Sequence, residues 1–266
     1  MLAELSDTKA YVCRDFCHRP FPKEMPAAGK RNEERKRNEM KLKHLESILQ
    51  QVQGFEDPQV SLEQYLTPPH LAACVLLNAA ANEDIEDKDV ADLGCGTGML
   101  GIGSQVLGAA RSVGFEIDES AAAIARNNIE EFEVEMEIVM GDVLEAQFEP
   151  EFDTVLLNPP FGTKPGNRGI DMKFLRQAVQ LSKYRVYSLH KSSTRNYILR
   201  TVKSWGVDAD VIAEMRYNLP KTYSFHKAKS KDVEVDLIRL TISRKAEDSS
   251  YAKDAMQKAS AQGESD

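Results

Sequence analysis

The chain of 266 residues is long enough for one substantial domain with tails, and its 42% hydrophobic content is ordinary for a globular protein. No run of residues is apolar over the length of a bilayer, which excludes a transmembrane helix and predicts no membrane partner. The net charge of −8 argues against a protein that is basic all over, as many nucleic-acid-binding proteins are.

The charges are segregated along the sequence. Residues 41–182 carry far more Asp and Glu than Lys and Arg, whereas basic residues outnumber acidic ones in residues 183–245. A basic half can attract phosphate groups even when the total charge is negative. The alternative is that folding scatters these charges over the surface.

Composition divides the chain into three regions. Residues 1–39 contain several prolines and are expected to be a flexible accessory extension. Residues 40–245 are expected to form the folded domain, and residues 246–266 a disordered acidic tail. The four cysteines form no paired framework, so a reducing compartment, the cytoplasm or the nucleus, is expected.

Two features of the accessory extension have ordinary alternatives. Cys13, Cys17 and His18 lie close together, but a structural metal site normally has four ligands. Incidental residues are therefore favoured and no metal is predicted. The basic run from Lys30 to Arg37 suits an RNA contact or a nuclear address, or equally a solvated segment before the next helix.

Two helices are predicted before the first strand. Apolar residues at helical spacing predict an amphipathic helix over residues 41–52, ended by Gly54. A second helix is predicted over residues 71–81, and Thr67 and Pro68 suit its N-cap and first helical position.

A predicted strand over residues 88–93 runs directly into a glycine-rich turn, which a helix over residues 100–107 follows. The turn reads Asp92-Leu93-Gly94-Cys95-Gly96-Thr97-Gly98-Met99. Its glycines allow the backbone to approach a ligand closely. The spacing differs from the dinucleotide-binding pattern Gly-x-Gly-x-x-Gly and resembles the S-adenosyl-L-methionine loop of class I methyltransferases.

This resemblance implies the roles of several residues. The glycines would admit the methionine part of S-adenosylmethionine, and Asp92 would orient its amino group. Glu116, at the end of a predicted strand over residues 112–118, stands where a carboxylate can accept both ribose hydroxyls. The Gln-Tyr-x-Thr-Pro turn resembles a segment that closes over the cofactor, with Gln64 and Thr67 as its contacts.

After a predicted helix over residues 120–131, acidic and apolar residues alternate over residues 131–138. This period predicts a strand with one solvated face, lying at a sheet edge. Asp142 is then placed to accept a hydrogen bond from the cofactor's adenine amine, and Val143 to pack on the adenine ring. The alternative for Asp142 is a turn residue.

A predicted buried strand over residues 152–157 stops at a stiff corner that reads Asn158-Pro159-Pro160-Phe161. It resembles the Asp/Asn-Pro-Pro-aromatic motif of methyltransferases that modify planar nitrogens. Asn158 and the carbonyl of Pro159 can each accept one N–H from a target amine, and Phe161 can stack on the base. The alternative is a proline-terminated strand with a buried aromatic residue.

The second half of the chain offers candidate RNA contacts. The glycine-rich residues 162–169 are either a lid over the target base or an ordinary loop. A helix over residues 172–183 and a strand over residues 186–189 precede Lys191 and Arg195, which suit phosphate groups. Alternatively, Ser192 or Ser193 is the N-cap of a helix predicted over residues 195–205. Such a cap is compatible with phosphate contacts by Lys191 and Arg195.

The last two predicted strands, residues 207–219 and 233–243, are joined by a connection rich in basic and aromatic residues. This mixture suits single-stranded nucleic acid, through stacking and charge neutralisation. The candidate RNA-binding residues there are Lys221, Lys227 and Lys229. A solvated hairpin loop is the competing interpretation.

Taken together, residues 40–243 closely resemble the methyltransferase-like protein five family of RNA adenine-N6 methyltransferases, which act on small-subunit ribosomal RNA. The stretches that match are Leu-Glu-Gln-Tyr, Val-Ala-Asp-Leu-Gly-Cys-Gly, Asn-Pro-Pro-Phe-Gly-Thr-Lys, Tyr-Ser-Leu-His-Lys-Ser-Ser-Thr-Arg and Glu-Val-Asp-Leu-Ile-Arg. The resemblance departs at residues 1–39, at the acidic tail and at Glu116, where Asp is common.

The resemblance implies a class I, Rossmann-like α/β fold with a seven-stranded, mostly parallel sheet and helices on both faces. It implies S-adenosylmethionine as cofactor, structured ribosomal RNA as substrate, and a small zinc-binding activator subunit that docks along the edge strand. Two alternatives stay open: a glutamine-N5 protein methyltransferase, whose motif usually ends in Tyr, and a non-catalytic RNA-binding assembly subunit.

Overall fold

The computed structural model describes residues 41–164, 166–220 and 230–243. The expected accessory extension, the expected tail and the candidate contacts Lys221, Lys227 and Lys229 lie outside the described residues. So do Cys13, Cys17 and His18.

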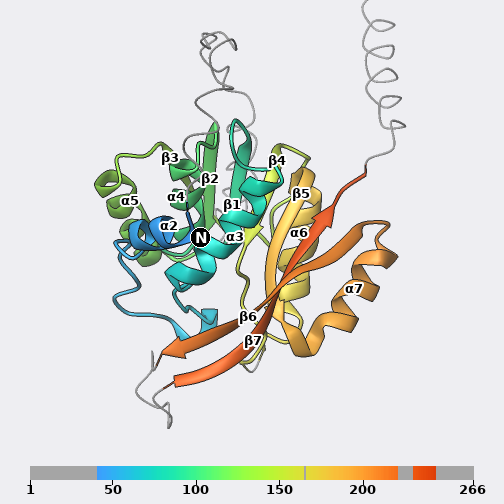
Figure 1. Ribbon diagram of the computed structural model, residues 1–266. Helices are drawn as coiled ribbons and strands as arrows, with labels where there is room; N and C mark the ends of the chain where they lie inside the picture. Colours follow the sequence, from blue (N-terminus) through green and yellow to red (C-terminus); the bar gives the residue numbers. More distant parts are fainter. Residues whose placement is uncertain (1–40, 165, 221–229, 244–266) are drawn as a thin grey trace, which may run out of the picture.

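Within these residues seven strands form one sheet in the order β3-β2-β1-β4-β5-β7-β6, which confirms the predicted fold class (Figure 1). Strands β1 to β5 pair with one another in parallel, and β7 lies antiparallel between β5 and β6. The strands are β1 (Asp89–Leu93), β2 (Arg111–Glu116), β3 (Met136–Met140), β4 (Phe152–Leu157), β5 (Ser182–Lys191), β6 (Asp208–Pro220) and β7 (Ser230–Thr241).

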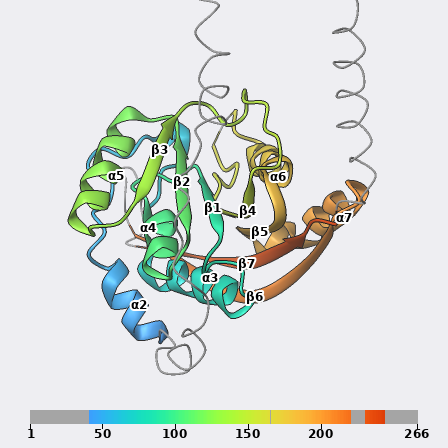
Figure 2. The same ribbon diagram turned by 90° about the horizontal axis from the view of Figure 1, so that it is seen from above.

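Helices cover both faces of the sheet, as predicted (Figure 2). Helices α2, α3 and α4 pack in one apolar cluster on one face, and α6 and α7 in another on the opposite face. The helical elements are α2 (Leu42–Leu49), η1 (Val60–Leu62), α3 (Pro69–Ala81), α4 (Met99–Val106), α5 (Glu119–Glu131), α6 (Ile170–Leu181), η2 (Ser192–Thr194) and α7 (Arg195–Ser204).

Strand β4 shows why the central strands read as continuous apolar runs. Successive side chains of a strand point to opposite faces, so Leu156 packs beneath α3 while Val155 and Leu157 pack beneath α6. All three are fully buried. A parallel sheet covered on both faces therefore needs apolar residues at consecutive positions rather than at alternate ones.

The sheet order creates a crevice at its centre. The chain adds β2 and β3 on one side of β1 and then crosses to place β4 on the other side. Ligands bind at such a switch point, beyond the carboxyl ends of the strands. Here the carboxyl ends of β1 and β4 bring the glycine-rich turn and Asn158 to the same edge of the sheet.

The first two helix boundaries differ from the predictions. Helix α2 ends at Leu49, and Gln50 rather than Gly54 follows it. Helix α3 begins at Pro69 with Pro68 as its N-cap, and no side chain caps it, so the predicted cap by Thr67 was wrong. The two prolines set this boundary, because each restricts the residue before it to extended geometry.

Two later boundaries also differ. Strand β3 begins only at Met136, because a turn with Glu133 at φ 51° follows α5, yet its predicted position at the sheet edge is confirmed. Neither Ser192 nor Ser193 caps α7, whose N-cap Thr194 makes no side-chain capping bond. Ser192 instead donates its hydroxyl to Asp236, at 2.6 Å.

No helix in the described ranges has the length and apolar character needed to cross a bilayer. Over the same ranges no three His, Cys, Asp or Glu side chains converge as a metal-ion site. Cys74 and Cys95, the cysteines that the structure describes, are free thiols.

Candidate active site

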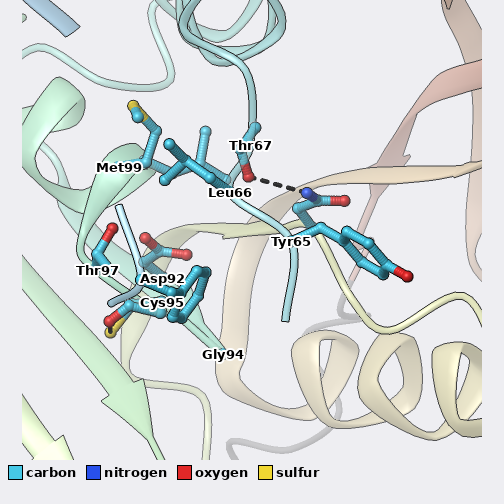
Figure 3. A pocket seen from close by; sticks show the side chains of 12 residues that line it. Tyr65, Leu66, Thr67, Asp92, Gly94, Cys95, Thr97 and Met99 are labelled. Atoms are coloured by element: carbon cyan, nitrogen blue, oxygen red, sulfur yellow. Dashed lines mark hydrogen bonds between the residues drawn. The ribbon is translucent and has the colours of Figure 1, made fainter. Parts of the chain in front are cut away.

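A pocket opens at the carboxyl ends of β1 and β4 (Figure 3). It joins three segments that are distant in sequence: the connection between α2 and α3, the glycine-rich turn after β1, and the corner after β4. Its lining residues are Phe55, Tyr65, Leu66, Thr67, Asp92, Gly94, Cys95, Gly96, Thr97, Met99, Leu100 and Asn158. The predicted cofactor turn and the predicted catalytic amide therefore share one pocket.

Backbone hydrogen bonds and left-handed glycine conformations determine the shape of the glycine-rich turn. The amides of Gly94 and Cys95 donate to the carbonyl of Phe115 at 2.9 and 3.0 Å. Gly94, Gly96 and Gly98 have φ values of +70°, +56° and +92°, which side chains rarely adopt. A Cβ on Gly96 would lie 2.8 Å from the Phe55 ring, so the close approach also requires glycine.

Asp92 is buried, and its carboxylate accepts a hydrogen bond from the Gly101 amide in the first turn of α4, at 2.9 Å. Burial, together with the smaller effect of the Glu116 charge, raises the pKa of Asp92 to about 7 although the Gly101 hydrogen bond opposes the shift. An acid that is half ionised near neutral pH suits a site that a cationic group enters.

Glu116 ends β2 beside the turn. One of its oxygens accepts from the Gly96 amide at 2.8 Å, and the other accepts from the amides of Ile117 and Asp118 at 3.0 and 2.9 Å. Burial raises the pKa of Glu116 in spite of these bonds. The hydrogen bonds fix the carboxylate at the strand end, which is the place predicted for a ribose contact.

The residues present fit S-adenosylmethionine, which the sequence predicts as cofactor. The backbone of Gly94 and Gly96 lines the pocket, and a Cβ on either glycine would press against Phe174 or Phe55, at 3.1 and 2.8 Å. Two fixed carboxylates, Asp92 and Glu116, match an ammonium group and a ribose diol. The buried hydroxyl of Thr97, which lines the pocket, has no hydrogen-bond partner in the part of the chain that the structure describes.

Asn158 is oriented by a residue from the far side of the pocket. Its Nδ2 donates to Oγ1 of Thr67 at 2.9 Å, which Figure 3 draws as a dashed line. Its Oδ1 is buried and has no hydrogen-bond partner among the described residues. A buried acceptor without a partner is costly, so this oxygen is available for a donor on a ligand.

Phe161 follows the two prolines, does not line this pocket and is partly buried against the apolar cluster beneath α3, so its stacking on a base stays a prediction. The ammonium group of Lys191, at the end of β5, lies 5.8 Å from the centre of the Phe161 ring and donates to its backbone carbonyl at 3.5 Å. The structure therefore places Lys191, a predicted phosphate contact, against the aromatic residue that is predicted to stack on the base.

Arg195 is held by carboxylates within the protein. Its guanidinium donates twice to the buried Asp236, at 2.6 and 2.7 Å, and pairs with Glu214 at 3.0 Å. Hydrogen bonds to Asp236 and Glu214 raise the pKa of Arg195. The bidentate geometry orients the side chain toward the sheet, so its predicted phosphate contact stays a prediction.

Asp142 and Val143 do not line this pocket. Asp142 accepts from the Leu144 amide at 2.8 Å, as the alternative of a turn residue predicted. Val143 is buried in the apolar cluster beneath α6. The amide of Gly141, directly before Asp142, donates to the carbonyl of Glu116 at 2.9 Å, and the predicted adenine contacts of Asp142 and Val143 stay predictions.

Gln64 also does not line the pocket but supports it. Its Nε2 donates to Asp118 at 2.7 Å, and its Oε1 accepts from the Gln59 amide at 2.6 Å. Asp118 lies two residues after Glu116 and caps α5 through the Ser120 amide. Gln64 therefore ties the connection between α2 and α3 to the cofactor side of the sheet.

Three residues with a role at the site were missed from the sequence: Phe55, Tyr65 and Glu63. The two aromatic residues line the pocket, and the buried Glu63 binds the loop after Phe161. Their position beside Gln64, in a connection already assigned to the cofactor, was the available signal. No local pattern distinguishes them from ordinary loop residues.

The chain is similar in sequence to known methyltransferases. The model of the "Methyltransferase small domain" family matches residues 71–184. The chain is 53% identical over 206 residues to the rRNA N(6)-adenosine-methyltransferase METTL5 of Danio rerio, covering 76% of this chain and 99% of that protein. It is 52% identical over 208 residues to the Mettl5 protein of Drosophila melanogaster, covering 76% and 97%.

A crystal structure of a putative RNA methyltransferase from Pyrococcus horikoshii is also similar. Its TM-score is 0.69 at 34% sequence identity, over 77% of this chain and 98% of that one. The similarity thus covers nearly the full length of these proteins and the described domain of this chain.

Proposed function

The chain belongs to the METTL5 family of rRNA N(6)-adenosine methyltransferases, and from this premise we propose how its residues perform the reaction. The protein is an S-adenosylmethionine-dependent enzyme that methylates the N6 amine of adenosine in ribosomal RNA. S-adenosylmethionine supplies a methyl group that is already activated by its sulfonium. The finer assignment to small-subunit ribosomal RNA is part of the proposal.

The free acceptor of Asn158 carries the proposal. An exocyclic amine is a poor nucleophile, because its lone pair is delocalised into the ring. Oδ1 of Asn158 accepts one N–H of the adenine amine, and the carbonyl of Pro159 accepts the other. These bonds strengthen as the nitrogen becomes tetrahedral, so they stabilise the transition state more than the ground state. Thr67 keeps the amide in the required orientation.

The remaining residues of the corner orient the base. The amine is unreachable inside a helix, so the adenine must leave its stack and enter the pocket. Phe161 stacks on the base, and Pro160 makes the corner stiff because it restricts the residue before it. Lys191 holds the Phe161 ring and carbonyl from β5.

On the side of the glycine-rich turn, Asp92 in the pocket lining binds the ammonium group of the cofactor, and Glu116, beside the turn but outside the lining, binds its ribose hydroxyls. Gly94, Gly96 and Gly98 provide the space for its methionine part. The buried position of both carboxylates supports these roles, because it makes each one an acceptor that gains from a ligand donor.

The test compares Asn158→Ala with the wild-type chain, using labelled S-adenosylmethionine and ribosomal RNA. We expect methyl transfer to fall by roughly 100-fold or more, with cofactor affinity nearly unchanged. Asn127→Ala, at an exposed position of α5, is the matched control and should behave as wild type. Full turnover by Asn158→Ala would remove Asn158 from the mechanism.

We also propose that a small zinc-binding activator subunit docks along β3. Among the residues that the structure describes, this strand is an edge of the sheet and pairs only with β2. Ile138 and Val139 are partly exposed there, and Ile117 nearby is 51% exposed. An edge strand can accept a strand from another chain. The measurement is co-elution of the two chains with hydrogen-exchange protection at residues 136–140; a complex without that protection would place the interface elsewhere.

We propose that the protein works in the cytoplasm and the nucleus. Two free thiols, Cys74 and Cys95, support a reducing compartment. Imaging of the tagged chain in fractionated cells is the measurement. A signal confined to a secretory or oxidising compartment would contradict this assignment.

A further inference from the structure

Glu63 occupies an unusual position for a charged residue. It follows η1 in the left-handed conformation, with φ 53°, which few residues other than glycine and asparagine adopt readily. Its amide donates to the carbonyl of Val60 at 3.1 Å, and its side chain is 93% buried, with a relative exposure of 7%. The backbone thus turns a carboxylate toward the protein interior.

The carboxylate of Glu63 accepts four hydrogen bonds from the loop that follows Phe161. The donors and distances are Thr163 N (2.8 Å), Thr163 Oγ1 (2.9 Å), Lys164 N (3.1 Å) and Asn167 Nδ2 (3.2 Å). These contacts join segments about 100 residues apart in sequence. A carboxylate suits this role because it has two acceptor oxygens and makes charge-assisted bonds.

The loop itself is tightly closed. Gly162 has φ +66°, and a Cβ there would lie 2.9 Å from the carbonyl oxygen of Asn167. The Asn167 amide donates to the carbonyl of Lys164 at 3.0 Å, and its side chain also donates to the carbonyl of Ser61 at 2.8 Å. Glu63 therefore fixes the backbone that begins at Thr163, two residues after Phe161.

The same short connection reaches both sides of the pocket. We call residues 59–67 the strap. Within it Gln64 binds Asp118 on the cofactor side, Thr67 binds Asn158 at the catalytic corner, and Glu63 binds the loop. The side chain of Glu63 and the carbonyl of Ser61 are thus the strap groups that bind the loop at the base-stacking end of the site.

We propose that Glu63 is a positioning residue for methyl transfer. By holding the amides of Thr163 and Lys164, it fixes the backbone after Phe161 and so sets the plane in which the target adenine stacks. The inference rests on the proposed function, because it assigns the base to Phe161. It predicts that Glu63 affects the rate of methyl transfer within the bound complex, measured as kcat, rather than cofactor affinity.

The test uses the full chain with ribosomal RNA and compares Glu63→Ala, Glu63→Gln and Thr163→Val. We expect Glu63→Ala to lower kcat by roughly 10- to 100-fold, since misplacing a reacting group by about 1 Å can cost that much. The dissociation constant of S-adenosylhomocysteine should stay unchanged. Amide hydrogen exchange at Thr163 and Lys164 should become faster.

Glu63→Gln is the conservative variant that should retain the activity lost in Glu63→Ala. Its Oε1 can still accept the three N–H donors, and its Nε2 can donate to the hydroxyl of Thr163. We therefore expect it to recover most of kcat and of the amide protection. Thr163→Val removes only the hydroxyl contact and should have a smaller effect than Glu63→Ala.

Different results would overturn the positioning role of Glu63 and the proposed function. Wild-type protein that transfers no methyl group to ribosomal RNA, either alone or with the activator subunit, would overturn the proposed function, while amide exchange would still decide whether Glu63 holds the loop. Active wild type with unchanged kcat in Glu63→Ala, or a loss of kcat without faster exchange at Thr163, would overturn the positioning role. If Glu63→Ala does not fold, Glu63→Gln and Thr163→Val decide by the same two measurements.

Discussion

The cofactor side and the target side of the pocket are built differently. On the cofactor side, backbone amides of the glycine-rich turn bind β2 and its terminal carboxylate within one βαβ unit. On the target side, Asn158 and the loop after Phe161 depend on side chains of the strap, from a distant part of the chain. The first region is determined locally, whereas the second is assembled by tertiary contacts.

This difference separates two kinds of defect. A change in the glycine-rich turn alters the shape of the cofactor site itself, so it should appear in cofactor affinity. A change at Glu63 or Thr67 leaves the backbone of that turn intact and loosens the groups that face the base, so it should appear in kcat. The following predictions run from the largest expected effect to the smallest.

The largest effect is expected for Gly96→Val. A β-branched residue at φ +56° is strained, and its Cβ would lie 2.8 Å from the Phe55 ring. We expect cofactor affinity to fall by about 100-fold, equivalent to roughly 2.7 kcal/mol. Calorimetric titration with S-adenosylhomocysteine is the measurement.

Gly108→Val is the matched control for Gly96→Val. Gly108 also has a positive φ, of +87°, but it is exposed and lies outside the pocket. We expect a lower melting temperature with cofactor affinity retained. Equal losses of affinity in both variants would show that backbone strain, rather than the shape of the cofactor site, is responsible.

A smaller effect is expected for Thr67→Val. The variant removes the acceptor for Nδ2 of Asn158, and an unsatisfied buried donor costs about 1–3 kcal/mol. We expect kcat to fall about tenfold with unchanged cofactor affinity, measured by single-turnover methyl transfer. Thr201→Val, on α7, is the control. A loss of cofactor affinity larger than the loss of kcat would contradict the division between the two sides.

The smallest effect is a pH dependence of cofactor binding through Asp92. Burial raises its pKa from 3.8 to about 7, so its ionised fraction falls about threefold between about pH 7.5 and 6.5. Cofactor affinity should weaken by a similar factor over this range, and the dependence should disappear in Asp92→Asn. Affinity in the wild type that is flat across the range would contradict this role.

The raised pKa of Asp92 also affects the free energy of unfolding of the protein without cofactor. This free energy changes with pH in the direction opposite to cofactor affinity. Because the folded state holds the Asp92 proton more tightly than the unfolded state, this residue favours folding below about pH 4. That contribution is lost as pH rises through about 7. Binding a cation beside Asp92 offsets the loss.

The regular elements and the cofactor turn were predictable because local patterns determine them. Strand β4 is a short apolar run that two prolines end, and the turn after β1 is a glycine pattern with few other uses. Thr67 shows where local reasoning fails. Its sequence context predicts an N-cap, but a contact with Asn158, 91 residues away, uses its hydroxyl instead.

Arg195 and Glu63 show the same limit. The sequence did not indicate that the buried carboxylate of Asp236 binds Arg195, whose predicted phosphate contact stays a prediction. Glu63 reads as a solvated residue of a turn, and only the folded chain brings the loop after Phe161 to it. Pairings of this kind depend on tertiary distances, which no local sequence window contains.

The burial of Cys95 protects the glycine-rich turn from oxidants. Burial raises the pKa of this thiol well above its usual value, and the charge of Asp92 raises it further. Oxidants and alkylating agents react with the thiolate, which is scarce at such a pKa. The turn can therefore carry a sulfur atom beside a reactive sulfonium without becoming a point of chemical damage.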